Sequence, residues 1–297
     1  MHKRSMRQTS FELPCNRLLR DMLGKYGAIN GYIEMSCQQM NTRVAGLGEK
    51  ELRTFLKEES AKYQIQLYDL PAKLFPLCIT QSLMVLPWAT LDSFYKEFAK
   101  EVRMLVREDF KINANDDETK LEAAIRELKA IDCDPKIERY KLNVYYYYNK
   151  IRTNFVHNLH DEKSLKAEKN LYKKIDQKEV SSFFPTIKAP SEPDKLTYAD
   201  FVLFTATIVN IADMLTISIK DSIDWDLYFK VQYQNIAEKR RLKEIDDDKW
   251  KKVCVDIPKV DGHTGASRVN YVSRCIQLIY GAKPSREIIE KNVCPIE

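Results

Sequence analysis

The chain has 297 residues and a mass of 34.8 kDa, enough to bury a sizeable core in one large domain or two smaller ones. Hydrophobic residues make up 44% of it and charged residues 31%, a balance that excludes disordered and fibrous proteins. Only 8 glycines are present, which disfavours all-β folds and glycine-rich nucleotide-binding folds. The net charge of +5 permits a nucleic-acid partner but does not require one.

Apolar periodicity predicts a chain that is helical along almost its whole length. The predicted helices, in chain order, cover residues 16–24, 30–45, 48–66, 77–107, 117–130, 136–160, 162–176, 197–220, 224–243 and 265–280. A stretch with three prolines, residues 182–194, is typical of a loop. We therefore predict an all-α fold, a helical bundle over 71–222, with an N-terminal helical region (1–70) and a C-terminal helical extension (223–297).

The most apolar stretch, residues 201–219, approaches the length of a membrane span. It contains Asn210, Asp213 and several hydroxyl side chains, and an aspartate within a membrane costs about 2.5–3.5 kcal/mol. We therefore predict a buried core helix and no membrane partner.

The cysteines and the N-terminus both favour a cytoplasmic protein. The seven cysteines include no CxxC pair, and an odd number without paired spacing is typical of reduced thiols. The basic stretch 1–14 lacks the apolar core of a secretory signal.

Familiar catalytic signatures are absent, because the sequence has no GxGxxG, P-loop, HExxH, GxSxG or EF-hand pattern. The chain has four histidines, at positions 2, 157, 160 and 263. The spacing of His157 and His160 could hold a metal, but no third ligand stands nearby. We expect neither a metal nor a cofactor.

The segment 145–161, YYYYNKIRTNFVHNLHD, holds the candidate site. On a helical wheel of about 100° per residue, Asn154 and His157 share a polar face. Arg152 falls among apolar residues, where a guanidinium is costly unless it is paired or faces a cleft or a partner. Its placement indicates either a structural ion pair, with Asp92 as the candidate partner, or a functional role.

The hexapeptide from Arg152 to His157, RTNFVH, fits an R-x4–6-H pattern and resembles the HEPN superfamily, an all-helical group that includes many metal-independent endoribonucleases. The setting is also similar to that family. The motif lies late in a long helix, between an earlier helix that carries Asp92 and a later apolar helix. The resemblance covers residues 75–222, roughly half of the chain.

This resemblance implies a metal-independent endoribonuclease with Arg152 and His157 as the catalytic pair. A neighbouring 2′-OH attacks the phosphate, a histidine exchanges protons near neutral pH, and an arginine stabilises the developing charge. Asn154, three residues before His157, is expected to orient the phosphate or the imidazole. The two catalytic residues lie about 140° apart on an ideal helix, so either the arginine side chain curls round, or the helix distorts, or each residue meets the other's counterpart across a dimer. The resemblance implies the last of these, a homodimer.

Three further residues complete the predicted site. We expect Lys150 to bind backbone phosphate and Tyr147 to stack on an unpaired base, with Asp92 in a supporting role. The expected biological role is that of a toxin or an antiviral effector, with RNA as substrate and an antitoxin or regulatory protein as a further partner. Two other functions stay open: a non-catalytic HEPN-like module that binds RNA or a protein, and a helical scaffold without a nucleic-acid role.

Overall fold

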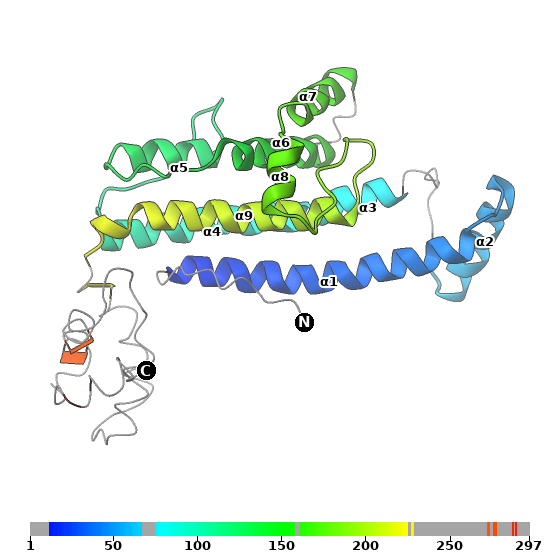
Figure 1. The fold of residues 1–297 in the computed structure, drawn as a ribbon. Coiled ribbons are helices and arrows are strands. Elements are labelled where there is room, and N and C mark those ends of the chain that lie inside the picture. Colours follow the sequence, from blue (N-terminus) through cyan, green and yellow to red (C-terminus); the bar gives the residue numbers. More distant parts are fainter. Residues whose placement is uncertain are drawn as a thin grey trace. The chain divides into compact units, whose positions relative to one another are not determined.

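The computed structural model describes residues 12–66, 75–157 and 161–224, with short pieces at 227–228, 272–273, 276–277, 287 and 289. Every regular element in these stretches is a helix, which confirms the predicted all-α class. The elements are α1 (Pro14–Val44), α2 (Glu49–Lys62), α3 (Phe75–Leu83), α4 (Val85–Leu105), α5 (Lys120–Lys129), α6 (Arg139–Val156), α7 (Glu162–Tyr172), α8 (Gln177–Phe183), α9 (Tyr198–Ser218) and the 3-10 helix η2 (Lys220–Ser222) (Figure 1). The predicted helices 224–243 and 265–280 lie almost wholly outside the described residues.

One continuous helix, α1, replaces the two helices predicted over 16–24 and 30–45. The predicted gap contains Gly27, and a glycine inside a helix costs roughly 1 kcal/mol relative to alanine. The helix continues through it because Leu23 before the glycine and Asn30 after it are buried on the same face. Burial of this face outweighs the low helix propensity of Gly27.

The single helix predicted over 77–107 is interrupted at Met84, so that α3 ends at Leu83 and α4 begins at Val85. Pro87 lies in the first turn of α4. It has no N–H to donate to the carbonyl of Leu83, which explains the interruption.

A short helix that the sequence pattern did not predict, α8, begins at Gln177. It begins there because Asp176 caps it: one carboxylate oxygen accepts the backbone N–H groups of Lys178 at 2.9 Å and of Glu179 at 3.1 Å. The predicted boundary at Gly46 and Gly48 is confirmed, since α1 ends at Val44 and Gly46 has a positive φ of 88°.

The chain divides into two compact units, each made of discontinuous stretches. The first comprises Met1–Asn16, Tyr95–Pro135 and Asp213–Glu297, and the second comprises Arg17–Phe94 and Lys136–Ala212. The consecutive division into 1–70, 71–222 and 223–297 stays a prediction, because most of its last segment lies outside the described residues.

The apolar helix α9 is the one helix in the described part of the chain with the length and apolarity of a membrane span. More than half of its most apolar window is buried inside the protein, and Phe204 and Ile208 are fully buried. These buried side chains make it a core helix, as the sequence predicts.

A buried carboxylate on α9 organises the second unit. Asp200 is fully buried, and its Oδ1 accepts the hydroxyl of Tyr148 at 2.8 Å and the backbone N–H of Ser191 at 2.7 Å. Its Oδ2 accepts the backbone N–H of Thr197 at 2.8 Å and the hydroxyl of the same residue at 3.1 Å. Burial, together with the charge of Asp200, raises the pKa of Tyr148 well above its ordinary value, so the hydroxyl remains a donor. These bonds join α6, α9 and the loop between α8 and α9.

Replacing Asp200 with alanine is expected to lower the free energy of unfolding by at least about 3 kcal/mol, because it leaves the buried hydroxyl of Tyr148 and the backbone N–H groups of Ser191 and Thr197 without their acceptor. The control is Asp194→Ala on the exposed surface, expected to change stability by less than about 0.5 kcal/mol. Urea unfolding measures both. Equal midpoints for the two variants would contradict this account of the core.

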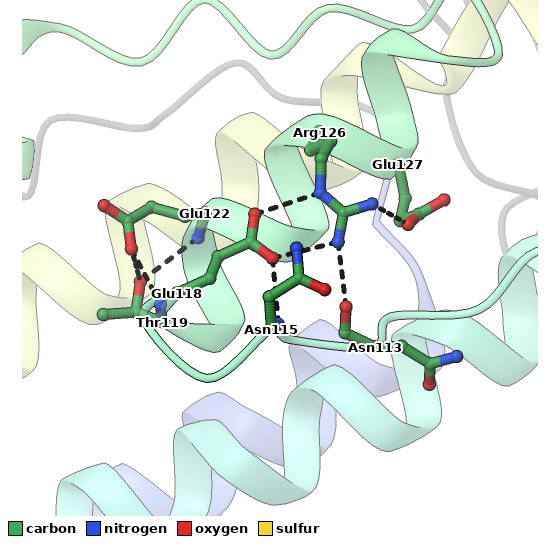
Figure 2. Close-up of polar contacts among 7 residues, drawn as sticks. All are labelled: Asn113, Asn115, Glu118, Thr119, Glu122, Arg126 and Glu127. Carbon is green, nitrogen blue, oxygen red and sulfur yellow. Dashed lines mark hydrogen bonds and ion pairs between the residues drawn. The ribbon is translucent and has the colours of Figure 1, made fainter.

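In the first unit, Arg126 holds the loop that precedes α5 (Figure 2). Its Nε donates to one carboxylate oxygen of Glu118 at 3.0 Å, and its Nη2 donates to the other at 2.9 Å. Nη2 also donates to the carbonyl of Asn113 at 2.8 Å. Next to this fork, Thr119 caps α5, and its backbone N–H donates to the Glu122 carboxylate at 2.7 Å. The start of α5 is therefore fixed by a reciprocal cap and a bidentate ion pair.

The bidentate ion pair of Arg126 with Glu118 predicts a pH dependence of stability, because the hydrogen bonds from Arg126 lower the pKa of Glu118 below the ordinary value of 4.5. A carboxyl whose pKa is lowered on folding stabilises the fold above its unfolded pKa, and this stabilisation is lost as the pH falls through its folded pKa. The stability gap between wild type and Arg126→Gln is therefore expected to be constant above about pH 5.5 and to shrink below about pH 4.5. Urea midpoints across a pH series measure the gap, and an equal gap at neutral and acid pH would contradict the assignment.

Candidate functional site

The last turn of α6 leaves His157 open to solvent. The helix ends at Val156, and His157 is its C-cap residue, with φ −94° and ψ 10°. Its backbone N–H still donates to the carbonyl of Thr153 at 3.1 Å, while its side chain is exposed. The helix predicted to continue to residue 160 thus ends earlier, and residues 158–160 lie outside the described residues.

Arg152 is half-buried and stacks on an aromatic side chain of α4. Its Cζ atom lies 3.5 Å from the centroid of the Trp88 ring. Its Nε is buried and has no hydrogen-bond partner. Burial lowers the pKa of the guanidinium, and the negative charge of Asp92 offsets this effect only in part. The side chain keeps its charge, which the surrounding residues compensate incompletely, and this favours an anionic ligand.

Asn154 does not lie on the exposed polar face that the helical wheel predicted. Its side chain is 1% exposed, because α7 covers this side of α6. Its Nδ2 donates to Oε1 of the buried Glu168 at 2.6 Å and to the carbonyl of Ser164 at 3.5 Å. Asn154 therefore joins α6 to α7 and does not offer its amide to a substrate in this structure.

Tyr147 was expected to stack on RNA bases, and this expectation is wrong for the described conformation. The residue is fully buried, and its hydroxyl donates to the carbonyl of Ser191 at 2.5 Å. Burial raises the pKa of Tyr147, which keeps this donor protonated. Lys150 is half-buried on α6, and Asp92 is half-buried on α4. Of the four consecutive tyrosines, Tyr146 is the one that is partly exposed.

Two residues at this site were missed from the sequence. Trp88 stands four residues before Asp92, so the two share a face of α4, and this spacing could have suggested it. Glu168 stands 14 residues after Asn154 on another helix, and no sequence pattern links them.

The described residues contain no metal-binding cluster, and a cavity elsewhere in the second unit offers no cationic site. No group of three His, Cys, Asp or Glu side chains in that part of the chain could hold a metal ion. A cavity of about 520 Å³ lies between α1, α2 and α3, and none of the predicted site residues lines it. Its one arginine, Arg43, donates to Glu59 at 2.6 Å, so this cavity offers no uncompensated positive charge to a phosphate.

Comparison of the chain with protein-family models, with curated proteins and with solved structures gives no match in any of the three. The site is therefore interpreted from its own geometry: an incompletely compensated arginine on Trp88, and an exposed histidine at the end of the same helix.

Arg152→Met is expected to leave the free energy of unfolding unchanged within about 1 kcal/mol, or to raise it, because burial already disfavours the charge. Arg43→Met is the control and is expected to lower stability, since it leaves Glu59 without the arginine that binds it. Urea unfolding distinguishes the two. A loss of several kcal/mol in Arg152→Met would mean that Arg152 has a structural role instead.

Proposed function

We propose that this chain is a metal-independent endoribonuclease of the HEPN type, in which Arg152 binds the scissile phosphate and His157 transfers protons. The observation that carries the proposal is the half-buried guanidinium of Arg152, with its Nε unpaired, held on Trp88 five residues before an exposed histidine. An aromatic ring orients a guanidinium without neutralising it, which leaves its charge available to a phosphate.

The proposed reaction breaks one phosphodiester bond by internal transesterification. The 2′-oxygen attacks phosphorus as its proton passes to a base, and the bond from phosphorus to the 5′-oxygen breaks as that oxygen receives a proton. The products are a 2′,3′-cyclic phosphate and a 5′-hydroxyl, and no metal is needed. Arg152 stabilises the negative charge on the non-bridging oxygens in the transition state.

A homodimer supports this chemistry. One imidazole cannot be deprotonated as the base and protonated as the acid at the same moment, whereas two copies of His157 can divide these roles. We place the enzyme in the cytoplasm, and the free thiols of Cys15, Cys37, Cys78 and Cys133 support this location. A toxin or antiviral role, held in check by an antitoxin or another regulatory protein, belongs to the same proposal.

A second candidate is a HEPN-like module that binds RNA or a protein without cleaving RNA. The burial of Asn154 favours it, because a residue expected to assist catalysis joins α6 to α7 instead. The two candidates differ in what happens to RNA once it is bound.

The test is RNA cleavage in the presence of EDTA by the wild type, His157→Ala and, as a control for a neighbouring histidine, His160→Ala. His157→Ala is expected to slow cleavage by at least about 100-fold, the usual contribution of a general acid or base, while His160→Ala cleaves like the wild type. Circular dichroism confirms that each variant is folded. Equal cleavage by wild type and His157→Ala contradicts the site, and RNA binding without any cleavage supports the second candidate.

A further inference from the structure

We propose that the outward surface of α7 binds the phosphate backbone of the RNA. This surface, called the α7 lysine face, consists of Lys163, Lys166, Lys169, Lys173 and Lys174. The inference rests on the proposed function, because it supplies the RNA-binding surface that cleavage needs. It also assigns to these lysines the RNA-binding role that was expected of Tyr147.

All five lysines are exposed: Lys163, Lys166 and Lys169 lie on one side of α7, Lys173 is its C-cap residue, and Lys174 follows directly. At about 100° per residue the three lysines within the helix fall within an arc of about 120°. The centre of this arc lies opposite Ser164 and Glu168, the two buried residues of α7 that face α6. None of the five lysines forms a salt bridge with a described residue.

Repulsion between the lysines of this face lowers the stability of the helix. Lys163 with Lys166, Lys166 with Lys169, and Lys169 with Lys173 are like-charged neighbours at spacings of three or four residues. Each such pair destabilises a helix by about 0.2–0.5 kcal/mol. Within 162–174, all of which is described, Glu162 is the one carboxylate on this side. A bound polyanion relieves this repulsion.

Two hydrogen bonds fix the α7 lysine face against α6, beside which α7 lies (Figure 1). Asn154 donates to Glu168 at 2.6 Å, and Nδ2 of Asn143 donates to the carbonyl of Lys174 at 2.9 Å. Because Asn154 lies between Arg152 and His157 in the sequence, the first bond holds the middle of α7 at the end of α6 that carries the proposed catalytic pair. Because these hydrogen bonds already hold the α7 lysine face in place, RNA binding does not have to order it and avoids that loss of entropy.

The spacing suits a nucleic-acid strand. From Lys163 to its last residue, Tyr172, α7 rises by about 14 Å, which allows contacts with more than one phosphate. Lysine binds phosphate as a point charge without reading the base, so we expect binding that depends on salt and little on sequence.

The test is the binding of a labelled 2′-O-methyl RNA oligonucleotide, which lacks the attacking hydroxyl and therefore reports binding without cleavage. The variant is Lys166→Gln, Lys169→Gln, Lys173→Gln in the full chain. The control makes the same charge change at three exposed lysines elsewhere, Lys50→Gln, Lys57→Gln, Lys111→Gln. Fluorescence anisotropy from about 50 to 200 mM KCl gives Kd and its salt dependence.

The α7 variant is expected to bind at least about 10-fold more weakly at low salt, with a slope of log K against log salt smaller by about 2, while the control binds within about twofold of the wild type. The proposal is overturned if the α7 variant binds like the wild type, if the control loses as much affinity, or if the wild type binds anionic vesicles but no RNA. If RNA binds through α7 but is not cleaved, the proposed endoribonuclease activity is contradicted and this inference is not. If cleavage depends on His157 but is unchanged in the α7 variant, this inference is contradicted and the proposed activity is not.

Discussion

The hydrogen bond from Tyr148 to the buried carboxylate of Asp200 joins α6 to α9, and the candidate residues that α6 carries depend on how that helix is held. The neighbouring hydroxyl of Tyr147 adds a second bond, to the carbonyl of Ser191. Burying two consecutive tyrosines is tolerable only because both hydroxyls find acceptors. With α6 held in this rotation, Arg152 contacts Trp88 and Asn154 contacts Glu168.

The buried polar groups of the second unit differ in how completely they are compensated. Both carboxylate oxygens of Asp200 accept hydrogen bonds, so the fold compensates this buried charge and the carboxylate stabilises the structure. Arg152 has a buried Nε without a partner, and its pKa is lowered by burial. A buried group that the fold leaves poorly compensated is a candidate functional residue.

The sequence predicts the helices well, because their periodicity is a local property, and it predicts that Arg152 points toward apolar neighbours. It does not predict that Asn154 is buried, since a helical wheel gives the direction of each side chain but not which element covers that direction. The polar side of α6 is covered by α7 through Glu168, a contact between residues that no local pattern connects. The burial of Tyr147 is not predicted for a related reason, because a run of four tyrosines does not show which ring faces the core. The interruption at Met84 follows from the missing N–H of Pro87, which is local and was available from the sequence.

The stacking of Arg152 on Trp88 ties two positions on different helices to one another. Lysine cannot take the place of the arginine, because its ammonium lacks the flat guanidinium that covers a ring, and an aliphatic residue cannot take the place of the indole without leaving the cation against an unsuitable surface. Among related chains, positions 88 and 152 should therefore covary: an aromatic residue is retained wherever the arginine is retained, and both constraints relax together where the arginine is lost.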